Sequence, residues 1–161
     1  VEYGVETCND ETLLRVNRGH DFACARKAIE ETARRGIRVG AHIILGLPGE
    51  DAKESLRQAP IISSLPLTTL KIHQLQIIRG TRLAKMYAEK PFHLYTVEEY
   101  IKLIADYISL LRPDLVLERF VSQSPPDLLI APKWGLKNYE FTHRLHNYMK
   151  GKLNNNAQSD K

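Results

Sequence analysis

The spacing of apolar residues along the chain alternates between the pattern of buried strands and that of amphipathic helices. Residues 37–45 (IRVGAHIIL) are too apolar and β-branched for a surface strand, and they predict a parallel strand covered on both faces. Before this strand, apolar residues at helical spacing predict a helix over residues 21–35, which Gly36 caps. A capping box of Thr96 and Glu99 begins another helix, whose apolar residues share one face.

The remaining elements follow from the same periodicities and from turn residues. Strands that alternate with helices predict an α/β fold, namely a parallel sheet of about four strands with flanking helices. Four strands are too few to close an eight-stranded barrel, so the sheet is either open or part of a barrel. We predict further strands over residues 1–7, 70–77 and 115–121, and further helices over residues 11–16, 51–64 (kinked or ended early by Pro60), 82–88 and 139–150.

The length of the chain and its two ends define the expected domain. The 161 residues can bury one core, which we place in residues 1–150. Residues 151–161 (GKLNNNAQSDK) have almost nothing apolar to bury, and we expect this tail to be disordered. Because the chain opens at Val1 in a strand-like run, we expect it to be a piece of a longer protein, truncated at its N-terminus.

The composition is that of an ordinary soluble protein, with 43% hydrophobic and 26% charged residues. No apolar run approaches the roughly 20 residues that cross a bilayer. No signal peptide is visible either, so we expect a cytoplasmic protein with no membrane partner. The charges behind the net +4 are dispersed, which favours a solvated surface over a nucleic-acid footprint. The two cysteines, Cys8 and Cys24, lack metal-binding spacing, and we expect reduced thiols.

Candidate chemistry gathers at the end of the predicted strand 37–45. The turn from Gly46 to Glu50 combines two glycines with a proline, which lets the backbone approach a ligand closely. In parallel α/β sheets, ligands bind beyond the carboxyl ends of the strands. One hypothesis is therefore an α/β enzyme with an anion site at this turn, although the Glu50 carboxylate would repel phosphate. Another is a basic nucleic-acid-binding module, which the pI of about 9.1, Lys150 and Lys152 support.

Four blocks in the order VEYGVET, NRGHDF, GIRVGAHIILGLPGE and LKIHQLQIIRGT resemble the C-terminal half of a radical S-adenosylmethionine (radical SAM) protein. The resemblance covers nearly the whole chain up to about Lys150. It is greatest to an uncharacterised bacterial subfamily of iron–sulfur oxidoreductases. That subfamily is related to oxygen-independent coproporphyrinogen III oxidase and to the catalytic subunit of elongator. The resemblance implies the C-terminal part of a partial (β/α)6 barrel of the TIM type.

The resemblance also implies cofactors and a reaction. In this family a CxxxCxxC loop holds a [4Fe-4S] cluster that binds S-adenosylmethionine, and one electron then yields a radical that abstracts hydrogen from the substrate. This chain has no CxxxCxxC, so we expect the cluster ligands elsewhere in the intact protein and expect the chain alone to be inactive. The implied partners are a flavodoxin or ferredoxin as electron donor and an unknown small-molecule or macromolecular substrate.

Five residues match positions that contact the cofactor in the family. Glu6 stands where relatives have a glutamine at a strand end, and Arg18 matches an arginine suited to the methionyl carboxylate. His42 replaces an aspartate, Ile44 belongs to the apolar segment that flanks the adenine, and Gln76 stands where the backbone meets the adenine. Plainer interpretations remain, namely a strand-end carboxylate with a helix-dipole partner for Glu6, a surface ion pair with Asp10 or Asp21 for Arg18, and a core position for His42.

Two further groups stand near the expected substrate side. Lys71 and His73 share one face of their predicted strand and add polarity to the substrate side if that face lines the barrel. Trp134, with its neighbours Lys133 and Lys137, either closes the substrate end or is a packed core tryptophan.

Overall fold

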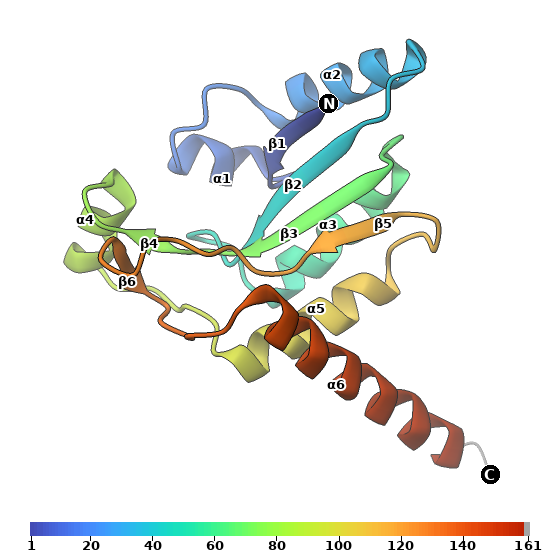
Figure 1. The fold of residues 1–161 in the computed structure, drawn as a ribbon. Coiled ribbons are helices and arrows are strands. Elements are labelled where there is room, and N and C mark those ends of the chain that lie inside the picture. The colour runs from blue at the N-terminus through green and yellow to red at the C-terminus, as the bar shows by residue number, and fades with distance from the viewer. Residues whose placement is uncertain (160–161) are drawn as a thin grey trace.

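The computed structural model describes residues 1–159, which form six strands and six helices joined by loops (Figure 1). Helices separate the strands of the main sheet along the chain, as the sequence predicts, and most bounds agree within a few residues. In chain order the elements are β1 (Glu2–Glu6), α1 (Asp10–Arg15), α2 (Phe22–Arg34), β2 (Gly40–Leu45), α3 (Ala52–Ser64), β3 (Thr69–Gln74), β4 (Ile77–Ile78), α4 (Arg82–Glu89), α5 (Val97–Ser109), β5 (Val116–Arg119), β6 (Leu129–Ala131) and α6 (Asn138–Ser159).

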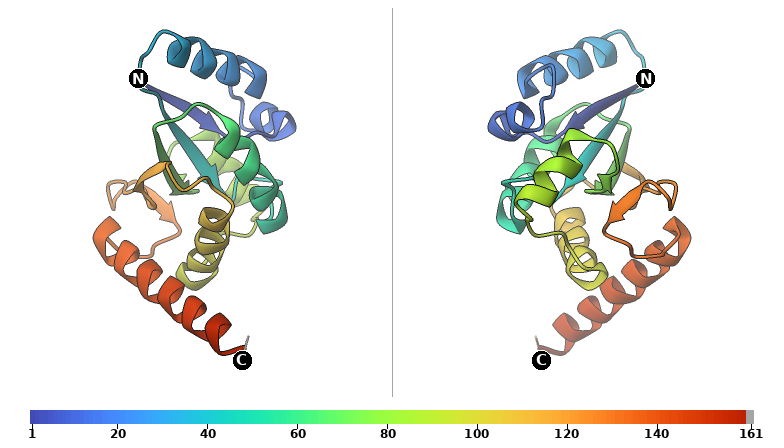
Figure 2. Two further views of the ribbon diagram at one scale, coloured as in Figure 1. Left: turned by 90° about the vertical axis from the view of Figure 1, so that its right-hand side faces the viewer. Right: turned by 90° about the vertical axis from the view of Figure 1, so that its left-hand side faces the viewer.

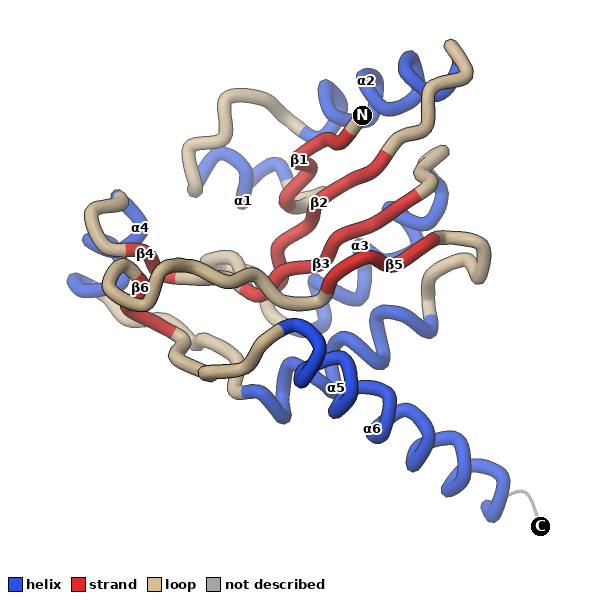
Figure 3. The backbone as a smooth tube through the Cα atoms, viewed as in Figure 1, coloured by secondary structure: helices blue, strands red, loops and turns tan. Residues whose placement is uncertain are grey.

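Strands β1, β2, β3 and β5 form one sheet in that order, and each neighbouring pair is parallel. This confirms the predicted parallel sheet of about four strands. Because the strands run in one direction, their carboxyl ends share one edge of the sheet. The link into α4 and the loops around β4 and β6 gather at that edge (Figure 3).

Helices α2, α3 and α5 cover one side of the sheet, and α6 packs against α5 (Figure 2). Side chains of a strand alternate between its two faces, so every second strand residue enters the core under these helices. The core residues of the strands and helices that meet there include Val5, Ala41, Ile43, Leu45, Leu70 and Ile72 from the sheet and Ile29, Ala59, Ile62 and Ile104 from the helices.

The other face of the sheet carries half-buried side chains of mixed chemistry. His42 and Ile44 lie there on β2, and Lys71 and His73 lie there on β3. Lys71 and His73 therefore share the face that points away from the helical core, and their role on the substrate side stays a prediction. We call this surface the open face.

The predicted strand 70–77 is two strands in the structure. β3 ends at Gln74, and β4 pairs antiparallel with β6 in a separate two-stranded sheet that the sequence analysis did not predict. The side-chain amides of Gln74 and Gln76 each donate to the Ser122 carbonyl at 3.1 Å. These bonds tie the link between β3 and β4 to the segment after β5, which turns the chain away from the main sheet.

One helix ends where the sequence predicts in spite of its internal proline, and another runs further than predicted. Helix α3 continues through Pro60 to Ser64, because Ala59 and Ile62 are buried and hold its last turn against the sheet. Helix α6 passes its predicted end at Lys150 and reaches Ser159, with Lys152 Nζ 2.6 Å from Asp106 Oδ1 of α5.

The segment 151–161, for which the sequence predicts disorder, thus begins within α6, and its residues 160–161 lie outside the described residues. The division into a domain and a tail stays a prediction. Across residues 1–159, no helix combines the length and the apolar character needed to cross a membrane.

Candidate functional site

A cavity of about 440 Å³ opens where β1, β2 and β3 end, and we call it the strand-end cavity. Four of the five residues predicted to contact the cofactor line it: Glu6, Arg18, Ile44 and Gln76. The volume is within the range of roughly 300–1,000 Å³ that small-molecule pockets occupy. The structure therefore brings together residues from three strands and from the loop between α1 and α2, as a shared ligand requires.

Glu6 and Arg18 form an ion pair on one wall of the cavity. Arg18 Nη2 lies 3.5 Å from Glu6 Oε1 and donates to the Gly4 carbonyl at 2.8 Å. Burial raises the pKa of Glu6, and the positive charge of Arg18 opposes that shift. Glu6 also has a φ of 66°, in the left-handed region that residues other than glycine rarely adopt outside functional or strained sites. The backbone conformation at the end of β1 therefore directs the Glu6 carboxylate toward the Arg18 guanidinium.

Gly4 makes room for this ion pair. A Cβ atom at Gly4 would lie 2.6 Å from Glu6 Oε1 and 2.7 Å from Arg18 Nη2, closer than van der Waals contact allows. Both of these atoms are at the ends of flexible side chains, so a larger residue would displace the Glu6–Arg18 ion pair and leave the strand intact. Glycine at this position thus positions the charged wall of the cavity.

Another part of the cavity wall is apolar and is flanked by the side-chain amide of Gln76. Ile44 and Leu47 line it, and Leu47 is buried with Leu75 and Ile77 in a small second core. The Gln76 side chain is used in holding the fold, because its amide donates to Ser122 and accepts from the Ser124 hydroxyl at 2.7 Å. The expected contact between the Gln76 backbone and the cofactor stays a prediction.

His42 is the predicted residue that does not line the strand-end cavity. Its Nε2 lies 2.9 Å from Glu2 Oε2, and its ring centre lies 5.6 Å from that of His73. Glu2 also pairs with Lys71, which lies 3.2 Å from Glu118 Oε2. His42 thus belongs to a charged network on the open face, and its role toward the cofactor stays a prediction.

Several residues that line the strand-end cavity were not found from the sequence. Arg15 in α1, Arg82 in α4 and Ser122 after β5 join the wall from distant parts of the chain. Arg15 also fixes the turn after β2, because its Nη1 donates to the Pro48 carbonyl at 2.7 Å. No local pattern marks these residues, because only the fold brings two helices and a loop together at this cavity.

A second cavity of about 540 Å³ lies beside the first and shares Gln74, Gln76 and Ser122 with it. Lys133, Trp134 and Lys137 line this second cavity. The indole is held firmly, since its Nε1 donates to the Tyr95 carbonyl at 3.1 Å and its ring stacks on Phe141. Trp134 is therefore a packed tryptophan that also lines the second cavity, and the idea that it closes the substrate end stays a prediction.

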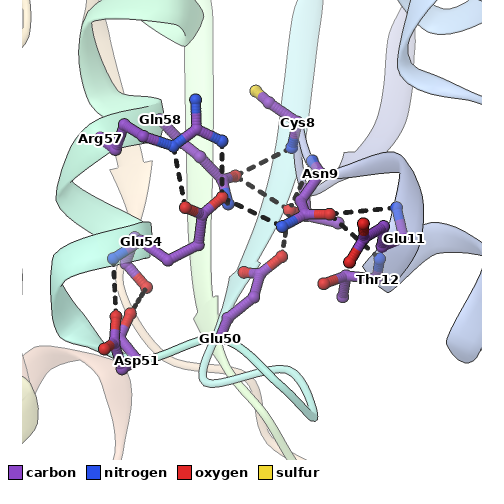
Figure 4. Close-up of polar contacts among 11 residues, drawn as sticks. Cys8, Asn9, Glu11, Thr12, Glu50, Asp51, Glu54, Arg57 and Gln58 are labelled. Carbon is purple, nitrogen blue, oxygen red and sulfur yellow. Dashed lines mark hydrogen bonds and ion pairs between the residues drawn. The ribbon is translucent and has the colours of Figure 1, made fainter.

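The Gly46–Glu50 turn leads into a buried polar network rather than into an anion site (Figure 4). Asp51 caps α3 by accepting from the Glu54 amide at 2.8 Å, so carboxylates already occupy this helix N-terminus. Nothing in this geometry supports the anion-site hypothesis.

The centre of this network is the buried hydroxyl of Thr7. Its Oγ1 lies 2.5 Å from Glu50 Oε1, 2.9 Å from Gln58 Oε1 and 3.1 Å from the Asn9 amide nitrogen. The Cys8 amide also donates to Gln58 Oε1. A threonine has one proton to donate, so the network is complete when Glu50 carries a proton and donates it to Thr7. Burial, the largest influence, raises the pKa of Glu50 and favours that protonated form.

The side chains that could ligate a metal ion do not cluster in the described part of the chain. In residues 1–159, no set of three or more His, Cys, Asp or Glu side chains is placed to hold a metal ion. Burial raises the pKa of the Cys8 thiol to about 12, so it stays protonated, and Cys24 is exposed and distant in sequence.

Comparisons with known proteins agree on one family. Residues 67–151 match the Radical_SAM C-terminal domain. Uncharacterized protein YtqA of Bacillus subtilis is 32% identical over 140 residues, which cover 87% of this chain and 44% of YtqA. Uncharacterized protein MJ0486 of Methanocaldococcus jannaschii is 33% identical over 151 residues, which cover 93% of this chain and 47% of MJ0486. The chain thus spans less than half the length of these two relatives.

More distant relatives include a tRNA uridine(34) acetyltransferase of M. jannaschii, which is 28% identical over 152 residues that cover 92% of this chain and 28% of that protein. The solved structure of Elp3 from Methanocaldococcus infernus with N-terminal residues 1–46 deleted superposes with a TM-score of 0.84 at 24% identity. That superposition covers 94% of this chain and 36% of Elp3, and it shows a shared fold. The chain therefore belongs to the radical SAM family and contains its C-terminal domain.

Proposed function

We propose that the intact protein is a radical SAM oxidoreductase that reductively cleaves S-adenosylmethionine at a [4Fe-4S] cluster and abstracts hydrogen from a substrate. This chain would supply the wall that faces the cofactor and the substrate, and alone it would be inactive. The observation that carries the proposal is the meeting of Glu6, Arg18, Ile44 and Gln76 in one cavity at the strand ends. A flavodoxin or ferredoxin as electron donor and a cytoplasmic location complete the proposal.

The residues present in the strand-end cavity fit S-adenosylmethionine. The cofactor carries an ammonium, a carboxylate and a flat apolar base, and when bound it supplies the radical precursor. Arg18 is permanently charged and would donate to the carboxylate. Burial raises the pKa of Glu6 and the charge of Arg18 opposes that shift, and the ionised carboxylate would accept from the ammonium. Ile44 and Leu47 offer the apolar surface that a base requires.

The test uses the full-length gene product, reconstituted anaerobically with iron and sulfide. Addition of dithionite and S-adenosylmethionine should yield 5'-deoxyadenosine, and its absence would count against the proposed reaction. Arg18→Met should weaken cofactor binding roughly 10- to 100-fold, the cost of losing a charged hydrogen bond. Arg26→Met is the matched control, because Arg26 is an exposed residue of α2 paired with Glu30. Equal affinities of the two variants would remove Arg18 from the site.

A tRNA substrate is the second candidate for the intact protein. The printed name tRNA uridine(34) acetyltransferase of several relatives favours it. Binding of the intact protein to tRNA should then weaken steeply as salt rises, because phosphate contacts release counterions. Absence of binding at low salt would dismiss both this candidate and the nucleic-acid-binding module.

A further inference from the structure

An arginine and a histidine on the open face are joined in an unusual way. Arg119 Nε, at the end of β5, donates to His73 Nε2 on β3 at a distance of 3.2 Å. A guanidinium stays protonated in proteins and has no acceptor atom. His73 Nε2 must therefore be the acceptor, which leaves the ring neutral with its single proton on Nδ1.

The surroundings of His73 reinforce this state. Burial, followed by the positive charge of Arg119, lowers the pKa of His73 to about 4. His42 and Lys71 add smaller contributions in the same direction. The nearby carboxylates of Glu2 and Glu118 are bound to Lys71, and within residues 1–159 none forms an ion pair with His73. No neighbour thus draws a second proton onto the ring near neutral pH.

His73 also lies where a ligand would meet it. It lines the strand-end cavity, and its register partner on β2 is Ile44, the predicted neighbour of the adenine. Within the described part of the chain, no group accepts a hydrogen bond from His73 Nδ1. The cavity wall also holds Arg15, Arg18 and Arg82 against the single carboxylate of Glu6. A donor N–H in a positively charged wall suits an anionic oxygen.

We propose that Arg119 fixes His73 as the neutral Nδ1–H tautomer, and that this N–H donates a hydrogen bond to a carboxylate or phosphate oxygen of the substrate. His73 then binds the ligand without gaining or losing a proton, and Arg119 is a positioning residue that acts through it. The nature of the ligand depends on the proposed function above, whereas the tautomer does not.

The first experiment reads the tautomer directly in this chain, labelled with 15N at its histidines. Long-range 1H–15N NMR spectra should show His73 as Nδ1–H and unchanged between about pH 5 and pH 8, where free histidine in the same sample titrates. In Arg119→Met the ring should titrate at higher pH and shift toward the Nε2–H form. A wild-type His73 that is Nε2–H, or that titrates with free histidine, would overturn the proposal.

The second experiment identifies the oxygen. Inorganic phosphate and acetate are titrated separately into the labelled chain. The anion that binds more tightly should shift the His73 Nδ1 resonance to saturation. The Arg119→Met variant should lose that response. Absence of a His73 response to either anion would overturn the ligand assignment, and the relative strength of the two distinguishes phosphate from carboxylate.

The third experiment uses the intact enzyme. His73→Asn keeps an N–H donor near the Nδ1 position, and His73→Leu removes it. The leucine variant should raise the KM for substrate roughly 10-fold, as a lost hydrogen bond to a charged group does, while asparagine restores most of the affinity. Equal KM values for the two variants would overturn the proposed donor. An enzyme that forms no 5'-deoxyadenosine would instead refute the proposed function and leave the NMR results standing.

Discussion

Removal of the Thr7 hydroxyl is the sharpest test of how the end of β1 is tied to α3. Thr7 is 1% exposed, and its Oγ1 bridges the Glu50 carboxyl, the Gln58 amide oxygen and the Asn9 amide. Valine has nearly the same shape, so Thr7→Val deletes the polar atom without opening a cavity. Glu50 and Gln58, which are also buried, would then lose the hydroxyl between them.

The size of the loss follows from these contacts. A buried polar group left without its partner costs about 1–3 kcal/mol, and an ordinary hydrogen bond contributes about 1 kcal/mol. Glu50 loses its shortest contact, while Gln58 Oε1 keeps the bond from the Cys8 amide. We therefore expect Thr7→Val to lower the free energy of unfolding by about 2–4 kcal/mol. Thr7→Ser keeps the hydroxyl and removes one buried methyl, which costs about 1 kcal/mol.

Urea unfolding measures the difference in stability between Thr7→Val and Thr7→Ser. The chain has one tryptophan, Trp134, whose fluorescence reports unfolding, and far-UV circular dichroism provides a second probe. The midpoints of Thr7→Val and Thr7→Ser should differ at an unchanged denaturant slope. A valine variant as stable as the serine variant would show that the hydroxyl network contributes nothing to stability.

Three further predictions concern other parts of the structure. Burial raises the pKa of Glu50 above 4.5 in the folded chain, so the contribution of this carboxyl to the free energy of unfolding is greatest below that pH and falls as the pH rises through the folded pKa. Glu50→Gln should remove this component of the pH dependence and be more stable than the wild type at neutral pH. A difference in urea midpoint between the two proteins that does not change across a pH series would contradict the reasoning. Gly4→Ala should displace the Glu6–Arg18 pair and weaken binding of S-adenosylmethionine to the intact protein with little loss of stability, so a variant with wild-type affinity by equilibrium dialysis would refute the crowding argument. Thr96→Ala should lower the free energy of unfolding by about 0.5–2 kcal/mol, because it breaks the capping box of α5. The thermal unfolding midpoint should fall, and an unchanged midpoint would mean that the cap does not contribute to stability.

Local sequence patterns predicted most of the fold because the helices and strands here carry their own signals. The Thr96 capping box and the β-branched run ending at Leu45 each identify an element without reference to the rest of the chain. Strand β6 carries no such signal, since Leu129–Ala131 is three residues long and depends on pairing with β4. The part of α6 beyond Lys150 likewise carries no local signal, and its contact with α5, between Lys152 and Asp106, joins residues far apart in sequence.

The candidate site divides in the same way. Glu6, Arg18, Ile44 and Gln76 lie at or just beyond strand ends or in the first loop, where topology alone places them near one another. His42 lies on the open face, but Glu2 holds its ring away from the cavity. The pairing of Arg119 with His73 joins two strands across a register shift between β3 and β5, and no spacing along the chain reveals it.

The side chains of Gln74 and Gln76, with Ser122, form the partition between the two cavities. Both amides are committed to one carbonyl oxygen, so the partition cannot shift on one side without moving the wall of the other. Ligands bound in the two cavities would therefore affect each other, because a ligand in one cavity would displace the wall that it shares with the other.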